Sequence, residues 1–178
     1  MCKFYSAVIS KNGELYHNQF TTSHEDIVSA YNLRDNGMIC RVEFYPDDDK
    51  DIFSPSKYKL HLDDEKPLWW TDEISEKTER SLLAVIKRMI ITEDQDLVLG
   101  KCVLLNGCKV SKIENSIIYS MKNSQVNEMW GNSQINVMWG NSQVNVMWEN
   151  SQVNVMRENS QVNEMWGNSK APKKPIKS

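Results

Sequence analysis

The side chains that could act as catalysts are few and scattered along this sequence. Its three histidines are His17, His24 and His61, and a run of carboxylates, residues 63–65, follows the last of them. Imidazoles and paired carboxylates are common general acids and bases. No nucleophile elbow, phosphate-binding glycine loop or H-x-E pattern accompanies them. We therefore expect surface or capping roles for these groups and no enzyme active site.

An acidic segment has the beginning of a calcium-binding loop but not its end. Asp47, Asp49 and Asp51 show the D-x-D-x-D spacing of such a loop. The motif requires Gly at its sixth position and Glu at its twelfth, where this sequence has Ile52 and Tyr58. We expect a solvated acidic loop, with no metal ion and no cofactor bound.

The four cysteines, at positions 2, 40, 102 and 108, form no C-x-x-C pair. Zinc sites need Cys and His ligands at closer spacing than this. Unpaired thiols are typical of reducing compartments and of buried or half-buried positions. The chain also lacks an apolar stretch of about 18 residues and a signal peptide, so the sequence predicts a soluble protein of the cytoplasm.

Charge is distributed unevenly along the chain. Residues 1–100 contain 12 Lys and Arg against 19 Asp and Glu, whereas residues 101–178 contain 9 against 5. Contacts with nucleic-acid phosphates require clustered Lys and Arg, so we do not expect the acidic part to bind nucleic acid directly. An acidic surface instead suits a basic protein partner.

Residues 1–96 predict an α+β domain that begins with a β-hairpin and a short helix. Apolar residues alternate at 4–10 and 15–20 on either side of Asn12-Gly13, which is a strong hairpin signal. Ser23 precedes two acidic residues and is expected to cap a helix that ends between residues 32 and 37.

Two strands and a long helix follow in this domain. Residues 38–45 and 58–62 alternate as strands, with a solvated loop at 46–51. Thr71 is expected to cap a helix of about 20 residues, whose apolar stripe runs from Leu82 to Ile90.

A nine-residue repeat dominates the C-terminal part. Asn-Ser recurs every nine residues from Asn123 to Asn168, and each complete unit contains Val or Ile followed three residues later by Met. This pairing continues backward in steps of eight, so the array is expected to begin near residue 97. The earlier pairs are Ile118 with Met121, Val110 with Ile113, and Cys102 with Leu105.

One repeat accommodates a strand of about five or six residues and a corner, which predicts a β-solenoid with about nine residues per side. A coil of the solenoid could consist of two such units or of three. We expect an α+β cap at 1–96, the solenoid at 97–169 and a basic tail at 170–178. The tail is expected either to blunt an open sheet edge or to leave the open end as a dimer interface.

Variation among the copies separates inward from outward positions. The residue before Met is Glu or Val, and the residue after it is Trp or Arg, so both positions are expected outside. The invariant Met and the near-invariant Val are expected inside, at positions 126, 129, 135, 138, 144, 147, 153, 156, 162 and 165. The Asn residues at 123, 132, 141 and 150 are expected to turn corners in left-handed conformation and to form hydrogen-bonded ladders.

In a two-sided coil, Trp130, Trp148 and Trp166 stack along one face, and Trp139 and Arg157 lie on the other. The simplest role of these rings is to cover the corners; the alternative is a surface for a protein partner or for self-association. Base stacking on single-stranded nucleic acid is disfavoured, because interleaved Lys and Arg are missing. The candidate partner surface comprises Trp130, Trp139, Trp148, Arg157, Trp166, Asp47, Asp48, Asp49, Asp51, Asp63, Asp64 and Glu65.

Three stretches resemble a group of uncharacterised phage and prophage proteins. They are the opening KFYSAVISKNGELYHNQFTTSHEDI, the segment YKLHLDDEKPLWWTDE before the long helix, and the NS-x-V-x-x-M array, and the resemblance covers nearly all of the chain. It implies a phage or mobile-element origin and brings no catalytic residues. We therefore expect a non-enzymatic inhibitor that binds a host defence complex, for example a CRISPR nuclease. The alternative is a scaffolding solenoid that self-associates.

Overall fold

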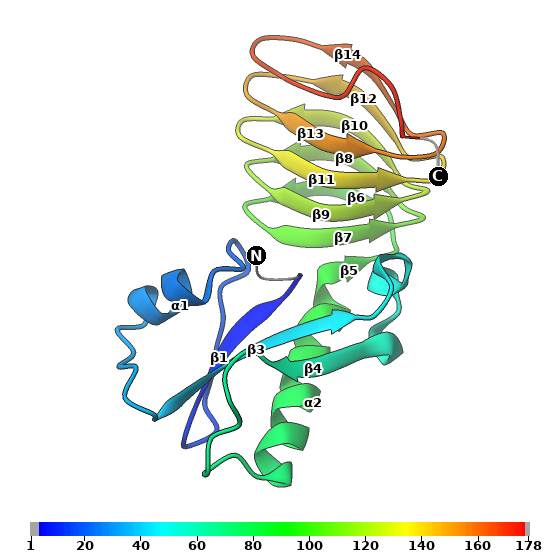
Figure 1. Ribbon diagram of the computed structural model, residues 1–178. Coiled ribbons are helices and arrows are strands. Elements are labelled where there is room, and N and C mark those ends of the chain that lie inside the picture. The colour runs from blue at the N-terminus through cyan, green and yellow to red at the C-terminus, as the bar shows by residue number, and fades with distance from the viewer. Residues whose placement is uncertain (1–3, 177–178) are drawn as a thin grey trace. The chain divides into compact units, whose positions relative to one another are not determined.

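The computed structural model describes residues 4–176, which belong to two compact units (Figure 1). The chain divides between Arg88 and Met89, whereas the sequence placed the boundary after residue 96. The difference arises from two short strands, β5 (Ile90–Ile91) and β6 (Gln95–Leu99), which pair with later strands of the solenoid. The solenoid thus begins before its repeat is recognisable in the sequence.

The first unit contains a four-stranded antiparallel sheet in the order β2-β1-β3-β4. Its strands are β1 (Ser6–Ser10), β2 (Leu15–Tyr16), β3 (Ile39–Pro46) and β4 (Tyr58–Leu62). The predicted hairpin is confirmed, but its second strand does not continue to residue 20. The side chains of Asn18 and Thr21 accept hydrogen bonds from nearby backbone N–H groups, and such local bonds compete with strand pairing.

A short helix, α1 (His24–Ala30), follows the hairpin as expected, and the Ser23 hydroxyl accepts a hydrogen bond from the Asp26 N–H at 3.2 Å. The segment expected as a loop is partly regular. A 3-10 helix, η1 (Asp49–Phe53), begins there because Asp48 caps it and Ile52 is buried. A second 3-10 helix, η2 (Pro55–Lys57), leads into β4.

The long helix α2 (Asp72–Met89) begins after Thr71, whose hydroxyl accepts a hydrogen bond from the Ile74 N–H at 3.3 Å. The predicted cap is therefore confirmed. Ile90, expected in the apolar stripe of this helix, instead opens β5. Within residues 4–176, no helix is long and apolar enough to cross a membrane.

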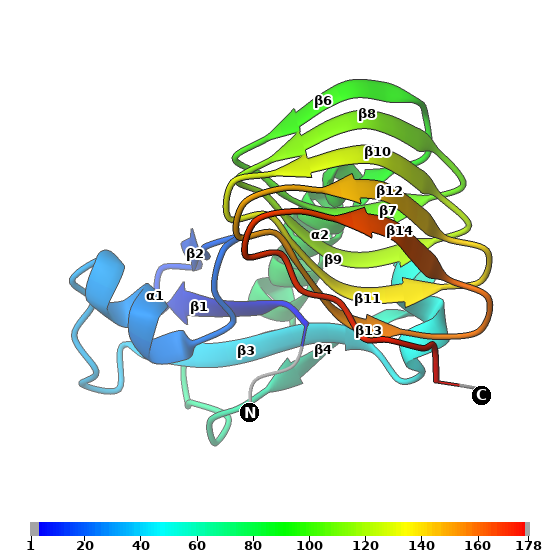
Figure 2. The same cartoon turned by 90° about the horizontal axis from the view of Figure 1, so that it is seen from above.

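The second unit is a β-solenoid, as predicted. Its strands alternate between two five-stranded parallel sheets, ordered β14-β12-β10-β8-β6 and β13-β11-β9-β7-β5 (Figure 2). The later strands are β7 (Cys102–Asn106), β8 (Lys109–Glu114), β9 (Ile117–Lys122), β10 (Gln125–Trp130), β11 (Gln134–Trp139), β12 (Gln143–Met147), β13 (Gln152–Met156) and β14 (Gln161–Met165).

Each strand pairs with the strand two places further along the chain. Val126 pairs with Val144, its counterpart two repeats later, and Val110 of the earlier part pairs with Val126. The Val positions that the repeat makes equivalent therefore stack on one another. Val110 joins this stack although its unit has eight residues instead of nine.

One member of the earliest traced pair, Cys102 with Leu105, is displaced by one residue, whereas Leu105 pairs with Met121 as predicted. The pairing of β7 with β9 shifts register between Val103 and Leu104, where β9 has one residue more, and Val103 rather than Cys102 pairs with Ile118. A bulge inserts one residue into a strand and changes which side chains face inward. The inward pair is therefore Val103 with Leu105, and the assignment of Cys102 was wrong.

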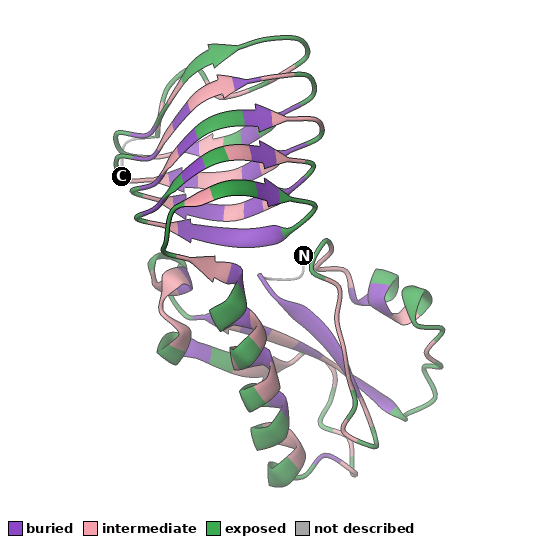
Figure 3. Ribbon diagram, turned by 180° about the vertical axis from the view of Figure 1, so that it is seen from behind, coloured by how far each residue is buried: buried purple, intermediate pink, exposed green. Residues whose placement is uncertain are grey.

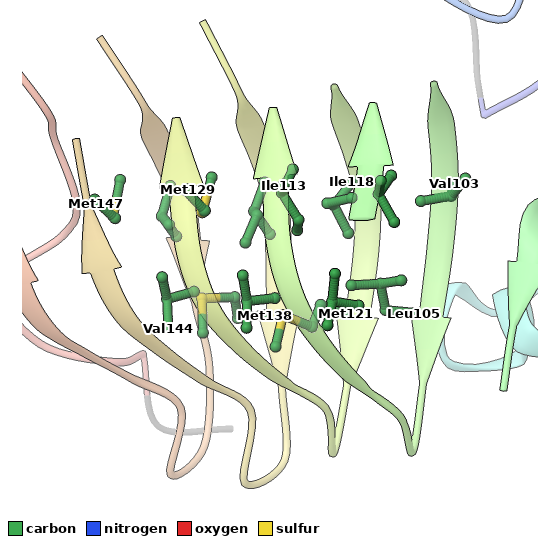
Figure 4. Packing of buried hydrophobic residues seen from close by; sticks show 14 of the residues in the cluster. Val103, Leu105, Ile113, Ile118, Met121, Met129, Met138, Val144 and Met147 are labelled. Atoms are coloured by element: carbon green, nitrogen blue, oxygen red, sulfur yellow. The ribbon is translucent and has the colours of Figure 1, made fainter. Parts of the chain in front are cut away.

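The Val and Met side chains of the repeats fill the space between the two sheets (Figure 4). Inward positions from residue 126 to residue 156 are at most 4% exposed. Val162 is only partly buried, and Met165, which was also expected inside, is 50% exposed. Both lie on β14, and among the described residues no strand pairs with its outer edge (Figure 3).

Asparagine ladders run along the outside of the solenoid, as predicted. The Asn150 side chain donates to that of Asn132 at 3.3 Å, and Asn159 donates to Asn141 at 3.1 Å. The second invariant Asn of each repeat forms further ladders in the middle of the strands. These bonds join Asn127 with Asn145, Asn145 with Asn163, and Asn136 with Asn154.

The left-handed corner positions differ from those predicted. Asn123 has a φ of 48°, as expected, but the predictions for Asn132, Asn141 and Asn150 were wrong, because the residue before each of them takes the left-handed conformation. In the nine-residue units the left-handed residues are Gly131, Gly140, Glu149, Glu158 and Gly167, with φ of 68°, 63°, 58°, 57° and 71°. A nine-residue unit has one more corner residue than an eight-residue unit. That residue makes the turn, and the following Asn is free to join its ladder.

Candidate partner-binding surfaces

The three histidines lie in different surroundings. Each ring contacts a different set of neighbours: Val42 and Asp63 for His24, Tyr5 for His17, and Tyr45 for His61. Burial lowers the pKa of His17, and the positive charge of Arg88 adds to this effect. Among the groups that could act as general acids or bases, the structure brings His24 and Asp63 together, with His24 Nδ1 3.3 Å from the Asp63 carboxylate.

The acidic segment after β3 is mostly exposed, as expected of a solvated region. Asp47 pairs with the Lys59 ammonium, and the Asp48 carboxylate caps η1. Asp49 is exposed and Asp51 is half-buried. Within residues 4–176, neither of these two carboxylates makes an ion pair, so both are available to a basic partner.

The carboxylates that follow β4 are partly used inside the unit. Asp64 accepts a hydrogen bond from the Arg41 N–H at 2.8 Å. The Arg41 guanidinium also pairs with Asp35 at 2.6 Å, and this contact raises the pKa of Arg41. Asp63 contacts the buried histidine described above. Glu65 is exposed and makes no ion pair within the part of the chain that is described.

Three of the cysteines are free thiols in buried positions, as predicted: Cys40, Cys102 and Cys108. Cys2 lies outside the described residues. Burial raises the pKa of Cys40 and that of Cys102 to about 12, so both remain protonated and weakly nucleophilic near neutral pH. Residues 4–176 contain no group of three or more His, Cys, Asp or Glu side chains that could hold a metal ion.

Three tryptophans form a stacked column at one corner of the solenoid. The centroids of Trp130 and Trp148 are 5.1 Å apart, and those of Trp148 and Trp166 are 5.9 Å apart. The ring planes are within 19° of parallel in both pairs. The predicted stacking is therefore confirmed, and the three rings present one continuous aromatic surface.

The second aromatic column is shorter. The Arg157 guanidinium lies 4.6 Å from the centroid of Trp139. Arg157 follows Trp139 by two repeats, as Trp166 follows Trp148 in the first column, so a cation here replaces the third ring. In the first column, the Lys112 ammonium lies 5.3 Å from the centroid of Trp130. Each column thus contains a cation–π contact, an arrangement that favours positive charge on indole faces.

Glutamates two residues before Trp130 and Trp166 bind the indole nitrogens. The Nε1 of Trp130 donates to Glu128 at 2.8 Å, and that of Trp166 donates to Glu164 at 3.3 Å. The buried Nε1 of Trp148 has no acceptor within the described residues. Sequence reasoning placed these glutamates outside but assigned them no role; their offset of two residues from Trp was the available signal.

The C-terminal tail covers the end of one sheet. The Val153 N–H donates to the carbonyl of Lys170, and the Ile176 N–H donates to that of Met156, both at 2.8 Å. The tail therefore occupies the outer edge of β13, which supports its expected role at an open edge. The end of the other sheet has no such cover within residues 4–176, and Trp166 there is 53% exposed.

Comparison with protein-family models, with curated proteins and with solved structures finds no match to this chain.

Proposed function

We propose that this chain is a non-enzymatic binding protein of phage or mobile-element origin that acts in the host cytoplasm. Its partner is a basic surface of a host defence complex, for example a CRISPR nuclease, and binding inhibits that complex. The origin rests on the sequence resemblance, and the chemistry of the partner rests on the surfaces described above.

The single observation that carries this proposal is the uncovered face of Trp166 in the first aromatic column. Both columns already contain a cation–π contact: Lys112 lies over the ring of Trp130, and Arg157 lies over the ring of Trp139. Trp166 is 53% exposed, and Glu164 lies at its ring nitrogen. An indole face beside a carboxylate favours an Arg or Lys side chain, because the cation gains both a cation–π contact and an ion pair.

The acidic residues of the first unit favour the same kind of partner. Asp49, Asp51 and Glu65 are the members of the candidate acidic surface whose carboxylates make no capping or ion-pair contact among the described residues. These groups would neutralise positive charges on a nucleic-acid-binding partner and would also speed the encounter with it.

We also propose that each nine-residue repeat forms one side of the coil, so that two repeats complete one turn. The pairing of Val126 with Val144 and of Ile135 with Val153 supports this unit, since partners lie two repeats apart in both sheets. In such a coil, tryptophans from every second repeat stack on one another. The length of the array then determines how far the aromatic column extends.

Affinity capture from a bacterium with an active defence system tests the proposed function. We expect the protein to recover a nuclease or sensor with a basic groove and to raise phage plating on that host. Trp166→Ala should weaken capture, since it removes the exposed indole, whereas Leu68→Ala, at a residue 106% exposed in the first unit, should not. Recovery of no defence component together with unchanged plating would overturn the proposal.

Self-association is the alternative function, and a different observation favours it. The outer edge of β14 is unpaired within the described residues, and apolar side chains lie beside it. Unpaired edges readily accept a strand from another chain.

A further inference from the structure

We infer that the outer edge of β14 is an interface between two copies of this chain, related by a two-fold axis. The inference deepens the self-association alternative by naming the strand, its register and its orientation. It does not depend on the binding of any other protein.

Apolar side chains gather at this end of the solenoid. Met165, Trp166 and Ile176 are 50%, 53% and 56% exposed, whereas the equivalent inward methionines 129, 138 and 147 are 0% exposed. Val162 is also only partly buried. The open end thus presents a cross-section of the hydrophobic core, which a further layer of strand would cover.

Only one of the two sheets can be extended here. The tail from Lys170 to Ile176 runs along the outer edge of β13 and contains two prolines, which have no N–H to donate. The outer edge of β14 has no such cover among the described residues. A second copy is therefore expected to add its strand to β14.

The sequence of β14 is complementary to itself when two copies run antiparallel. With the two-fold axis between Asn163 and Glu164, Val162 of each copy lies opposite Met165 of the other. Both are core positions, so their side chains extend the two cores into one. Asn163 then lies opposite Glu164 of the second copy, where the amide can donate to the carboxylate.

A head-to-tail arrangement is less complementary. Within the chain, Gln95 pairs with Val110, and the same ladder continues through Val126 and Val144 to Val162. If β6 of a second copy were placed on β14 in this register, Gln95 would lie over Val162. A polar side chain would then cover an apolar core position, as Gln95 does over Val110 within the chain, whereas the two-fold arrangement places apolar side chains opposite each other. The two-fold arrangement avoids this mismatch and closes after two copies.

Sedimentation equilibrium of the purified full chain tests the inference. We expect a concentration-dependent shift from the 20.7 kDa monomer to twice that mass. Met165→Glu should raise the dissociation constant of the dimer at least about tenfold, because it buries a charge opposite Val162. Leu68→Glu, the matched change at an exposed Leu in the first unit, should leave it unchanged.

Three outcomes overturn the inference: a monomer at all concentrations, a dimer unaffected by Met165→Glu, or growth beyond two copies. Met165→Glu is expected to fold, since residue 165 is half exposed, and an unchanged circular dichroism spectrum checks this. A monomeric protein that still captures a defence complex would overturn the dimer alone. A dimer that captures none would overturn only the proposed inhibitor.

Discussion

The early turns of the solenoid, residues 90–122, and the later turns, residues 123–169, contribute to the same two sheets from very different sequences. The early turns bury Val, Leu, Ile, Cys and a single Met, in units of about eight residues. The later turns bury Val, Ile and Met in near-identical units of nine. The irregular turns are nevertheless as well buried as the regular ones, and the most exposed inward residue, Met165, belongs to an exact repeat.

The comparison shows that burial depends on the strands to either side and not on the regularity of the repeat.

The corners of the early and later turns differ more than their cores do. The left-handed residue is Gly100, Gly107, Asn115 or Asn123 at the corners up to residue 123, and Gly or Glu at every later corner. The carboxylate of Glu149 accepts a hydrogen bond from the N–H of Gly131 at 2.9 Å. At this corner, the glycine of one turn is therefore followed by a glutamate two repeats later.

The largest expected effect tests burial within the regular turns. Met138→Ala should lower the free energy of unfolding of the solenoid by about 2–5 kcal/mol, because it leaves a cavity in a fully buried site. Met165→Ala, at the equivalent repeat position, should lower it by less than about 1 kcal/mol. Urea unfolding followed by circular dichroism measures both. Similar losses for the two variants would show that the position within the repeat, and not the neighbouring strands, determines the free energy that each Met contributes.

The second prediction concerns the corners. A Cβ on Gly140 would lie 2.1 Å from the Asn123 side-chain oxygen, which accepts a hydrogen bond from the Asn141 N–H, whereas a Cβ on Gly107 meets nothing within 4 Å. Both glycines have positive φ. Gly107→Ala should therefore cost about 1 kcal/mol from backbone strain, and Gly140→Ala about 1–3 kcal/mol more. Thermal unfolding of both variants compares these costs, and equal shifts would contradict a close corner contact.

The third prediction concerns stability at alkaline pH. Buried thiols make the stability of the early turns depend on pH in this range. Burial raises the pKa of Cys102 to about 12, whereas an unfolded thiol ionises near 8.5. Above about pH 8.5 the unfolded state loses a proton that the folded state keeps. Stability should then fall by about 1.4 kcal/mol per pH unit until about pH 12. Residues 123–169 contain no cysteine.

Cys102→Ala is the control for this pH dependence. It should reduce the alkaline slope by the contribution of one proton, as measured by urea unfolding between pH 8 and pH 11. An unchanged slope would mean that Cys102 ionises equally well in the folded protein.

Apart from the comparison variants Met165→Ala and Gly107→Ala, the smallest expected effect is that of Trp139→Ala. This change removes the contact with Arg157 at 4.6 Å but leaves Met138 in the core, so it should cost about 1 kcal/mol. Lys112→Ala, which uncovers Trp130 at the boundary of the early turns, should cost a similar amount. If Trp139→Ala destabilised the solenoid as much as Met138→Ala, the assignment of inward and outward positions would be wrong.

Local sequence signals predicted much of both units. Ser23 and Thr71 cap their helices because a side-chain oxygen before a helix satisfies backbone donors close in sequence. The nine-residue period predicted the solenoid and its Val and Met core, and the outward Trp positions predicted the aromatic column. Each of these features depends on spacing or on neighbours within a few residues.

Contacts between distant residues decided the remainder. The sequence places Gly, Gly, Glu, Glu and Gly at 131, 140, 149, 158 and 167, but the alternation of Gly with Glu has meaning only once corners two repeats apart are known to stack. The bulge where β7 pairs with β9, the cover of β13 by the tail and the exposure of Met165 depend likewise on which strand lies alongside. The sequence by itself determined the repeating unit and its inward side chains, because these are periodic. Only the tertiary structure decided where the stack is open, because an edge is defined by the neighbour it lacks.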